Sequence, residues 1–221
     1  MGVISIEQMD ELFWLGRYSE RVYTTIRLYF ISYDTMLDQD MQDYQNFCKS
    51  LEIPNIYQDS EDFRKRYPFD QDDQNSIISN LMRAYDNAVI LREEIGSETL
   101  SYIQLALYSM QKAKVSDAPI IEMMGVIDNI LAFWGIVDDS IDSEQVRNII
   151  KTGKRVERID LYARLKMDRS ELIRELHRLA PRIDRSKIDY DPVILSKLDV
   201  LIHEPEIDYQ AITKEVEKLS I

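Results

Sequence analysis

The chain has 221 residues, enough for one large domain or two small ones with a packed core. Its formal net charge of −13 argues against a surface that binds nucleic acid or anionic membranes. The single cysteine, Cys48, rules out an internal disulfide and is typical of a reducing cytosol. The two histidines, His177 and His203, leave little scope for histidine-based metal or acid–base chemistry.

The chain shows neither a membrane-span pattern nor a targeting pattern. No uninterrupted apolar run reaches about 18 residues, the length that a membrane helix needs. The first residues, MGVISIEQMDE, lack the pattern of a signal peptide. We therefore expect a cytoplasmic protein with no membrane and no nucleic-acid partner, and the sequence leaves the oligomeric state open.

Helical signals follow one another along the chain. Ser5 and Gln8 form a capping box for a helix expected over residues 6–38. The acidic stretch 52–75 contains two prolines and predicts a long loop with a helical turn near 60–66. Further helices are expected at 40–51, 76–114, 119–137, 142–166, 168–183, 192–203 and 208–219.

The predicted fold class is all-α, because no strand-like alternation occurs and glycine and proline are scarce. Long antiparallel helices are the usual packing for such a chain. We expect a helical domain over residues 1–166, followed by a C-terminal helical extension at 167–221 that packs on the same domain.

One pattern occurs twice. The segment GRYSERVYTTIRL begins at residue 16 and GKRVERIDLYARL begins at residue 153. The two segments agree at Gly16/Gly153, Glu20/Glu157, Arg21/Arg158, Arg27/Arg164 and Leu28/Leu165, and Arg17/Lys154 keeps its charge. The repeat predicts two equivalent helices.

The repeated glutamates lie within the apolar stripe of their helices. A charge on such a stripe must be paired, or its burial costs several kcal/mol. Glu20 and Arg27 are about 10 Å apart along the axis of one helix, too far for a pair within a helix. We therefore expect Glu20 and Glu157 to be buried and paired with arginines of other helices. The glycines would let the neighbouring helix approach closely.

A third segment, 77–110, places its apolar residues on one arc if it forms a single helix. Arg92 lies near the middle of that arc, four residues before Gly96. This placement predicts a further buried cation on a long helix.

Three other interpretations compete with the buried ionic layer. The charges can be solvated rim charges on long helices, which contribute little to stability. The sequence VDDSID, with Asp138, Asp139 and Asp142, resembles the Mg²⁺-binding DDxxD motif of prenyl-diphosphate enzymes. Those enzymes need a second acidic motif facing the first, which this chain lacks. The aspartates also suit the cap of a helix. A carboxylate metal site of the ferritin type needs Glu-x-x-His pairs, which the chain lacks, so we expect no metal.

Three segments together resemble the bacterial alpha-E domain family. These are LFWLGRYSERVYTTIRL, RAYDNAVILREEIGSETL and LAFWGIVDDSID followed by GKRVER, and the resemblance covers about residues 5–166. Tyr85 and Val89 stand where the family often has arginine, and Leu100 where it often has tryptophan. The two missing cations leave less positive charge for an anionic ligand.

The resemblance implies association with other proteins. Alpha-E proteins resemble accessory partners of a circularly permuted ATP-grasp amidoligase and of a transglutaminase-like peptidase. The resemblance implies no catalytic residue and no cofactor for this chain. We expect a protein that works through partner binding, without catalysis of its own. The alternatives are a binding module or enzyme whose Arg/Glu site holds a peptide or carboxylate ligand and, less favoured, a Mg²⁺-dependent prenyl-diphosphate enzyme. The candidate residues for the ionic layer or ligand site are Arg17, Glu20, Arg21, Arg27, Asn87, Arg92, Glu93, Glu98, Glu157, Arg158 and Arg164.

Overall fold

The computed structural model describes residues 4–38 and 43–219, and within these ranges it contains helices and no strand. The all-α fold class is therefore confirmed. The elements are α1 (Ile6–Asp38), α2 (Asp43–Leu51), α3 (Ser60–Arg66), α4 (Ile77–Ile90), α5 (Arg92–Val115), α6 (Pro119–Ser140), α7 (Glu144–Arg164), α8 (Arg169–Ser186), α9 (Pro192–His203), α10 (Tyr209–Val216) and the 3₁₀ turn η1 (Glu217–Leu219).

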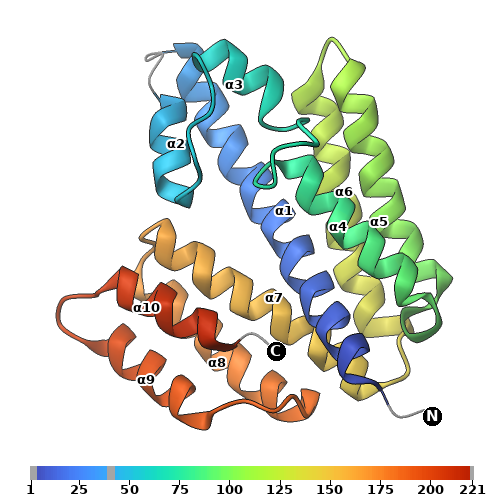
Figure 1. Ribbon diagram of the computed structural model, residues 1–221, viewed down its shortest axis with the longest axis vertical. Helices are drawn as coiled ribbons and strands as arrows, with labels where there is room; N and C mark the ends of the chain where they lie inside the picture. Colours follow the sequence, from blue (N-terminus) through green and yellow to red (C-terminus); the bar gives the residue numbers. More distant parts are fainter. Residues whose placement is uncertain (1–3, 39–42, 220–221) are drawn as a thin grey trace.

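Helix α1 is the central element. The predicted capping box opens it: the Gln8 amide donates to Ser5 Oγ (3.1 Å) and the Ser5 amide donates to Gln8 Oε1 (2.9 Å). Figure 1 shows α1 running diagonally through the molecule, with α4, α5 and α6 on one side and α7 to α10 on the other. Helix α1 contacts α2, α4, α6 and α7, so both halves of the molecule are built on it.

The two copies of the repeat form the crossing between α1 and α7. A Cβ atom at Gly16 would lie 2.0 Å from the carbonyl oxygen of Ile150, and one at Gly153 would lie 2.0 Å from that of Phe13. The two backbones therefore touch where each copy has its glycine. Gly16 lies beside Ile150, and Glu20 contacts Arg158 further along, so α1 and α7 run in the same direction.

Helices α5 and α6 run antiparallel, as expected for consecutive helices. Lys112 contacts Glu122 (2.9 Å), whereas Ser109 lies beside Asn129 (3.5 Å), so one helix rises as the other descends. The parallel α1–α7 pair instead joins the two copies of the repeat, which are not consecutive helices.

The long helix expected at 76–114 is in fact two helices. Helix α4 ends at Ile90, and Gly96 has φ 80° and ψ 154°, a conformation that residues with a side chain rarely adopt. The chain turns at this break and α5 packs back on α4. The prediction that Arg92 is buried was therefore wrong: Arg92 is exposed at the start of α5, because a single helical phase does not carry across the break.

Residues 52–75 cover the second half of α1. The helical turn predicted near 60–66 is α3, capped by Asp59, whose side chain accepts from the amide of Asp62 (2.8 Å). The aromatic rings of Tyr29 on α1 and of Phe63 on α3 lie together in the core, with centroids 6.1 Å apart. This stretch is thus a packed cover rather than an open loop.

Two helix ends differ from the sequence prediction. Helix α6 continues to Ser140, and Ser143 rather than Asp142 caps α7, with its Oγ accepting from the amide of Val146 (3.3 Å). Beyond α7, helices α8 and α10 pack on α7, and α9 packs on α8 and α10. The C-terminal helices therefore lie on the face of α7 that α1 leaves free (Figure 1).

Helix α6 is long and apolar enough to cross a membrane by length and composition. Its most apolar window has a mean hydropathy of 1.7, and 33% of that window is buried within the structure. The sequence predicted this helix but not its membrane-span character, because Glu122 and Asp128 interrupt the apolar run. Its buried face, which includes Val126 and Ile130, belongs to the core.

The glycine crossing predicts a sharp contrast between two glycine substitutions. Gly16→Ala should lower the free energy of unfolding by about 3 kcal/mol, because its methyl group would meet the carbonyl oxygen of Ile150. Gly135→Ala is the matched control: a Cβ there meets nothing within 4 Å, so this change should be neutral or raise stability by up to about 1 kcal/mol. Urea denaturation measures both, and equal effects of the two substitutions would contradict the close crossing.

Candidate functional site

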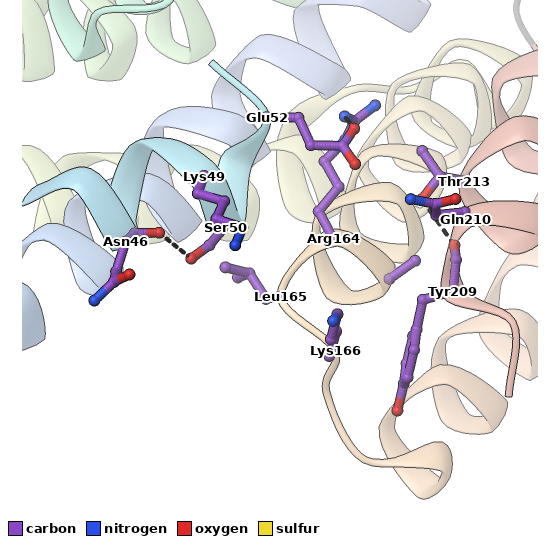
Figure 2. A pocket seen from close by; sticks show the side chains of 11 residues that line it. Asn46, Lys49, Ser50, Glu52, Arg164, Leu165, Lys166, Tyr209, Gln210 and Thr213 are labelled. Carbon is purple, nitrogen blue, oxygen red and sulfur yellow. Dashed lines mark hydrogen bonds and ion pairs between the residues drawn. The ribbon is translucent and has the colours of Figure 1, made fainter. Parts of the chain in front are cut away.

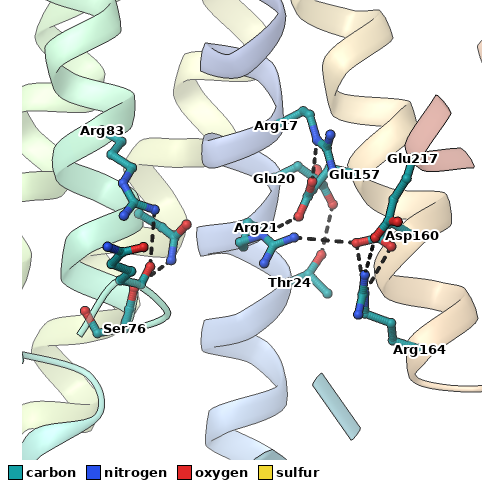
Figure 3. Close-up of polar contacts among 12 residues, drawn as sticks. Arg17, Glu20, Arg21, Thr24, Ser76, Arg83, Glu157, Asp160, Arg164 and Glu217 are labelled. Carbon is teal, nitrogen blue, oxygen red and sulfur yellow. Dashed lines mark hydrogen bonds and ion pairs between the residues drawn. The ribbon is translucent and has the colours of Figure 1, made fainter. Parts of the chain in front are cut away.

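The repeated charges meet across the α1–α7 crossing in reciprocal ion pairs. Figure 3 shows Arg17 and Arg21 of α1 with Glu157 of α7. Arg158 of α7 binds Glu20 of α1 through two hydrogen bonds, from Nε (2.7 Å) and from a terminal nitrogen (2.8 Å). In the opposite direction, Arg17 Nε donates to Glu157 (2.7 Å), and Arg21 Nε donates to the other oxygen of that carboxylate. Since Arg158 is the counterpart of Arg21, each copy's glutamate binds the equivalent arginine of the other copy.

Both glutamates are fully buried, with 0% of each exposed. The prediction that Glu20 and Glu157 are buried and paired with arginines of another helix is therefore confirmed. Arg17 is also buried, and its guanidinium lies 4.6 Å from the centre of the Trp14 ring. Thr24 Oγ1 donates to Glu20 (3.0 Å), so this carboxylate is satisfied by groups from both helices.

The ionic layer continues along α7 toward the C-terminal end of that helix. Asp160 accepts from Arg164 Nε at 3.0 and 3.1 Å and lies 3.5 Å from Arg21. Arg164 in turn contacts Glu217 (2.8 Å) and the carboxylate of Glu52, which follows α2. Arg164 thus links α2, α7 and η1, as the bridging cation of a network (Figure 3).

A fourth buried acidic residue extends the layer toward α8. Glu175 is fully buried and accepts from Arg155 (2.5 Å) and from Arg178 (2.9 Å). Sequence reasoning missed Glu175 and Asp160. Glu175 lies on the buried stripe of α8 between Leu172 and Leu179, and Asp160 stands four residues before Arg164, so the same search for charges on apolar stripes would have found both.

The environment shifts the pKa of several groups in this layer. Burial alone would raise the pKa of Glu157, but Arg21 and Arg17 outweigh it and hold that pKa below its ordinary value. Burial, and then the adjacent Glu157 carboxylate, raise the pKa of Asp160. Burial lowers the pKa of Lys154 to about 7; Glu20 opposes this shift and neighbouring cations add to it. The Lys154 ammonium lies 3.8 Å from the centre of the Trp134 ring.

The remaining predicted site residues lie outside the layer. Arg27 is exposed and donates to the Tyr23 hydroxyl (3.2 Å), so it takes no part in the ion pairs of the crossing. The angular position of Arg27 lies at the edge of the stripe, where a long side chain reaches solvent. Exposed Arg92 donates to Ser97 Oγ (3.0 Å).

Glu93 and Glu98, the acidic candidates near Arg92, are exposed as well and lie outside the buried layer. Half-buried Asn87 donates to the Glu11 carbonyl (3.1 Å), a contact that joins α4 to α1. The structure therefore brings together six of the candidates and separates five from them. The six are Arg17, Glu20, Arg21, Glu157, Arg158 and Arg164.

A cavity of about 460 Å³ lies beside Arg164, where α2, the end of α7 and α10 meet (Figure 2). Lys49 of α2 and Lys166 after α7 supply further positive charge, and Glu52 supplies negative charge. Arg92 lies at the opposite end of the bundle, next to Glu94, which contacts Gln8 near the start of α1. Arg92 and Arg164 therefore do not share a cavity.

The aspartates of VDDSID are separated by a helix end. Asp138 is on α6 and forms an ion pair with Lys151 of α7, whereas Asp142 lies beyond the end of α6. In residues 4–38 and 43–219, no three His, Cys, Asp or Glu side chains lie together as a metal site requires. The Mg²⁺–diphosphate interpretation thus gains no support from the geometry.

A family model named Alpha-E, a predicted alpha-helical domain with a conserved ER motif, matches residues 8–189. The chain belongs to the Alpha-E family. No curated protein and no solved structure matches it at a significant level.

The ER motif of the Alpha-E family fits this chain at two places, Glu20-Arg21 and Glu157-Arg158. Both pairs stand one turn beyond the glycine of their helix, where the side chains reach across the crossing. The Alpha-E match continues through α8 and ends at residue 189, before α9 begins. In this chain the motif holds two helices together, and α9 and α10 lie outside the match.

The buried pairs predict a large penalty for removing one partner. Glu20→Ala should lower the free energy of unfolding by about 3–5 kcal/mol, because the guanidinium of Arg158 loses its carboxylate. Glu98→Ala, which removes an exposed glutamate, is the matched control and should change stability by less than about 0.5 kcal/mol. A denaturation midpoint for Glu20→Ala equal to that of the wild type would refute the structural role.

The lowered pKa of Lys154 predicts a pH dependence. Between the folded pKa of about 7 and the ordinary value of 10.5, the unfolded chain binds more protons at this lysine than the folded chain. Stability should therefore rise with pH from 7 toward 10 at this site. Lys154→Met keeps the apolar stem and removes the amine, so it should flatten the slope. Urea denaturation at several pH values gives both slopes, and identical slopes would show that the amine is solvated.

Proposed function

We propose that this chain is a helical accessory protein of an ATP-grasp peptide or amide ligase system, acts through partner binding and carries out no catalysis of its own. The observation that carries the proposal is the internal pairing of the ER motif. Glu20 and Glu157 each bind two groups of the protein. Arg158 donates to Glu20 from Nε and from one terminal nitrogen, and its other terminal nitrogen lies 3.9 Å from Glu175. Charges engaged in this way are not available to a substrate.

The distribution of the other cations supports the same proposal. Arg27 and Arg92 are exposed on separate helices and face no common cavity with Arg164. A catalytic site of the ligase type instead concentrates positive donors around a phosphate or carboxylate. The chain also lacks a glycine-rich phosphate-binding loop.

Exposed apolar side chains on α5 and α6 support action through a surface. They include Tyr108 (65%) on α5 and Ile121 (68%) and Met124 (55%) on α6. Exposed apolar side chains of this size are available for contact with another protein. The identity of the partner rests on the family: Alpha-E proteins resemble accessory partners of circularly permuted ATP-grasp amidoligases and of transglutaminase-like peptidases.

A second candidate function is the binding of a peptide or carboxylate ligand. The cavity beside Arg164 favours it, because Lys49 and Lys166 line that cavity together with Arg164. Glu52 and Glu217 already engage the Arg164 guanidinium, which leaves the two lysines as the available cations. Binding of a peptide carboxylate that is lost in Lys49→Glu would favour this candidate.

The proposed function predicts which protein co-purifies with the chain. Tagged protein recovered from its own organism should carry an ATP-grasp amidoligase with it, and the purified chain should change the activity or stability of that enzyme. The isolated chain should not turn over ATP. Failure to recover such an enzyme, combined with ATP turnover by the isolated chain that is lost in Arg92→Ala, would refute the accessory role.

A further inference from the structure

A groove lies between α9 and α10, on the part of the chain beyond the family match. Its volume is about 580 Å³. Helix α9 and helix α10 with η1 run antiparallel here, since Lys197 lies beside Glu215 while Val200 and Leu201 line the groove with Ala211. The groove is lined by Ser196, Lys197, Val200, Leu201, Ala211, Lys214, Glu215 and Lys218.

The spacing of the lining residues suits a third helix. On α9 the lining residues span about one and a half helical turns, from Ser196 to Leu201. On α10 and η1 they recur at three- and four-residue spacings from Ala211 to Lys218. Each helix therefore offers one continuous stripe to the groove. Val200 is 60% exposed on the groove, which gives an incoming apolar side chain a surface to cover.

The rim of the groove is positive on a strongly negative chain. Lys197 and Lys218 share one acid, Glu215, at 3.7 and 2.7 Å. Lys214 is exposed and makes no ion pair within residues 4–38 and 43–219. Three lysines thus face one glutamate, whereas the whole chain carries −13. A local excess of this sign selects carboxylates.

Glu215 is largely buried, and its two carboxylate oxygens face different lysines of the rim. Oε1 lies nearest Lys197 and Oε2 nearest Lys218, so this one carboxylate is engaged by both. It does not neutralise three lysines, and the groove therefore combines an apolar surface with a net positive rim.

We propose that the α9–α10 groove binds an amphipathic helix of a partner protein, with apolar residues along one stripe and Asp or Glu on its flanks. The apolar stripe covers Val200, Leu201 and Ala211, and the flanking carboxylates meet Lys197, Lys214 and Lys218. The inference rests on the proposed accessory function, since it names the chemistry of a partner segment. Because α9 and α10 follow the Alpha-E match, the groove gives this chain a partner specificity of its own.

The experiment is a selection from a displayed library of helical peptides that carry a fixed leucine stripe, with flanks randomised among Glu, Gln and Lys. Glu should be enriched, and the selected peptide should bind at least about tenfold more weakly to Lys197→Glu/Lys214→Glu/Lys218→Glu. The neutral variant with Gln at the same three positions should be intermediate. The matched control reverses three exposed lysines elsewhere and should bind like the wild type; its changes are Lys65→Glu, Lys112→Glu and Lys114→Glu.

The outcomes separate this inference from the proposed function. Enrichment of Lys, no enrichment, or equal binding to the charge-reversed protein overturns the groove inference, and so does binding of anionic vesicles in place of the peptides. An ATP-grasp enzyme that still co-purifies with the charge-reversed protein would leave the proposed function intact. Peptide binding at the groove with no ATP-grasp partner in the cell would overturn the proposed function and leave the groove inference intact.

Discussion

The fold depends on the close backbone contact that Gly16 and Gly153 allow where α1 crosses α7. With no side chain at Gly16 or Gly153, α1 and α7 approach until a Cβ at either position would overlap a carbonyl oxygen of the other helix. That proximity is what allows Glu20 to reach Arg158, and Glu157 to reach Arg21, across the gap. Helices α4 and α6 pack on α1 with α5 packed on both of them, and α8 and α10 pack on α7, so the crossing holds the two halves together.

The buried charges fix the axial alignment of α1 with α7, which apolar side chains alone would not do. A slide of one helical turn, about 5.4 Å, would leave an apolar crossing packed but would separate every reciprocal pair. The carboxylates and guanidiniums would then be buried without partners, at a cost of several kcal/mol each. The ER motif therefore selects one alignment of α1 and α7, and the layer built from Asp160, Arg164 and Glu175 extends the same logic to neighbouring helices.

The repeat made the central pairs predictable, because a glutamate on two equivalent apolar stripes requires a partner from elsewhere. It could not reveal that the two helices are parallel, since that depends on the path of the chain between them. Arg92 was misplaced for a local reason: α4 ends at Ile90 and Leu91 departs from helical geometry, so the helical phase of α4 does not extend to Arg92. The α9–α10 groove was beyond reach, because it is formed by two short helices whose mutual placement no periodicity encodes.

A double-mutant cycle on Glu20 and Arg158 tests the role of the crossing most directly. The measurement is the free energy of unfolding of Glu20→Gln, Arg158→Met, the double variant and the wild type. A coupling free energy of about 1–3 kcal/mol is expected, since the double variant removes both buried charges and leaves neither unpaired. A coupling near zero, with additive losses, would contradict a buried pair across α1 and α7 and would return both residues to the list of groups available to a ligand.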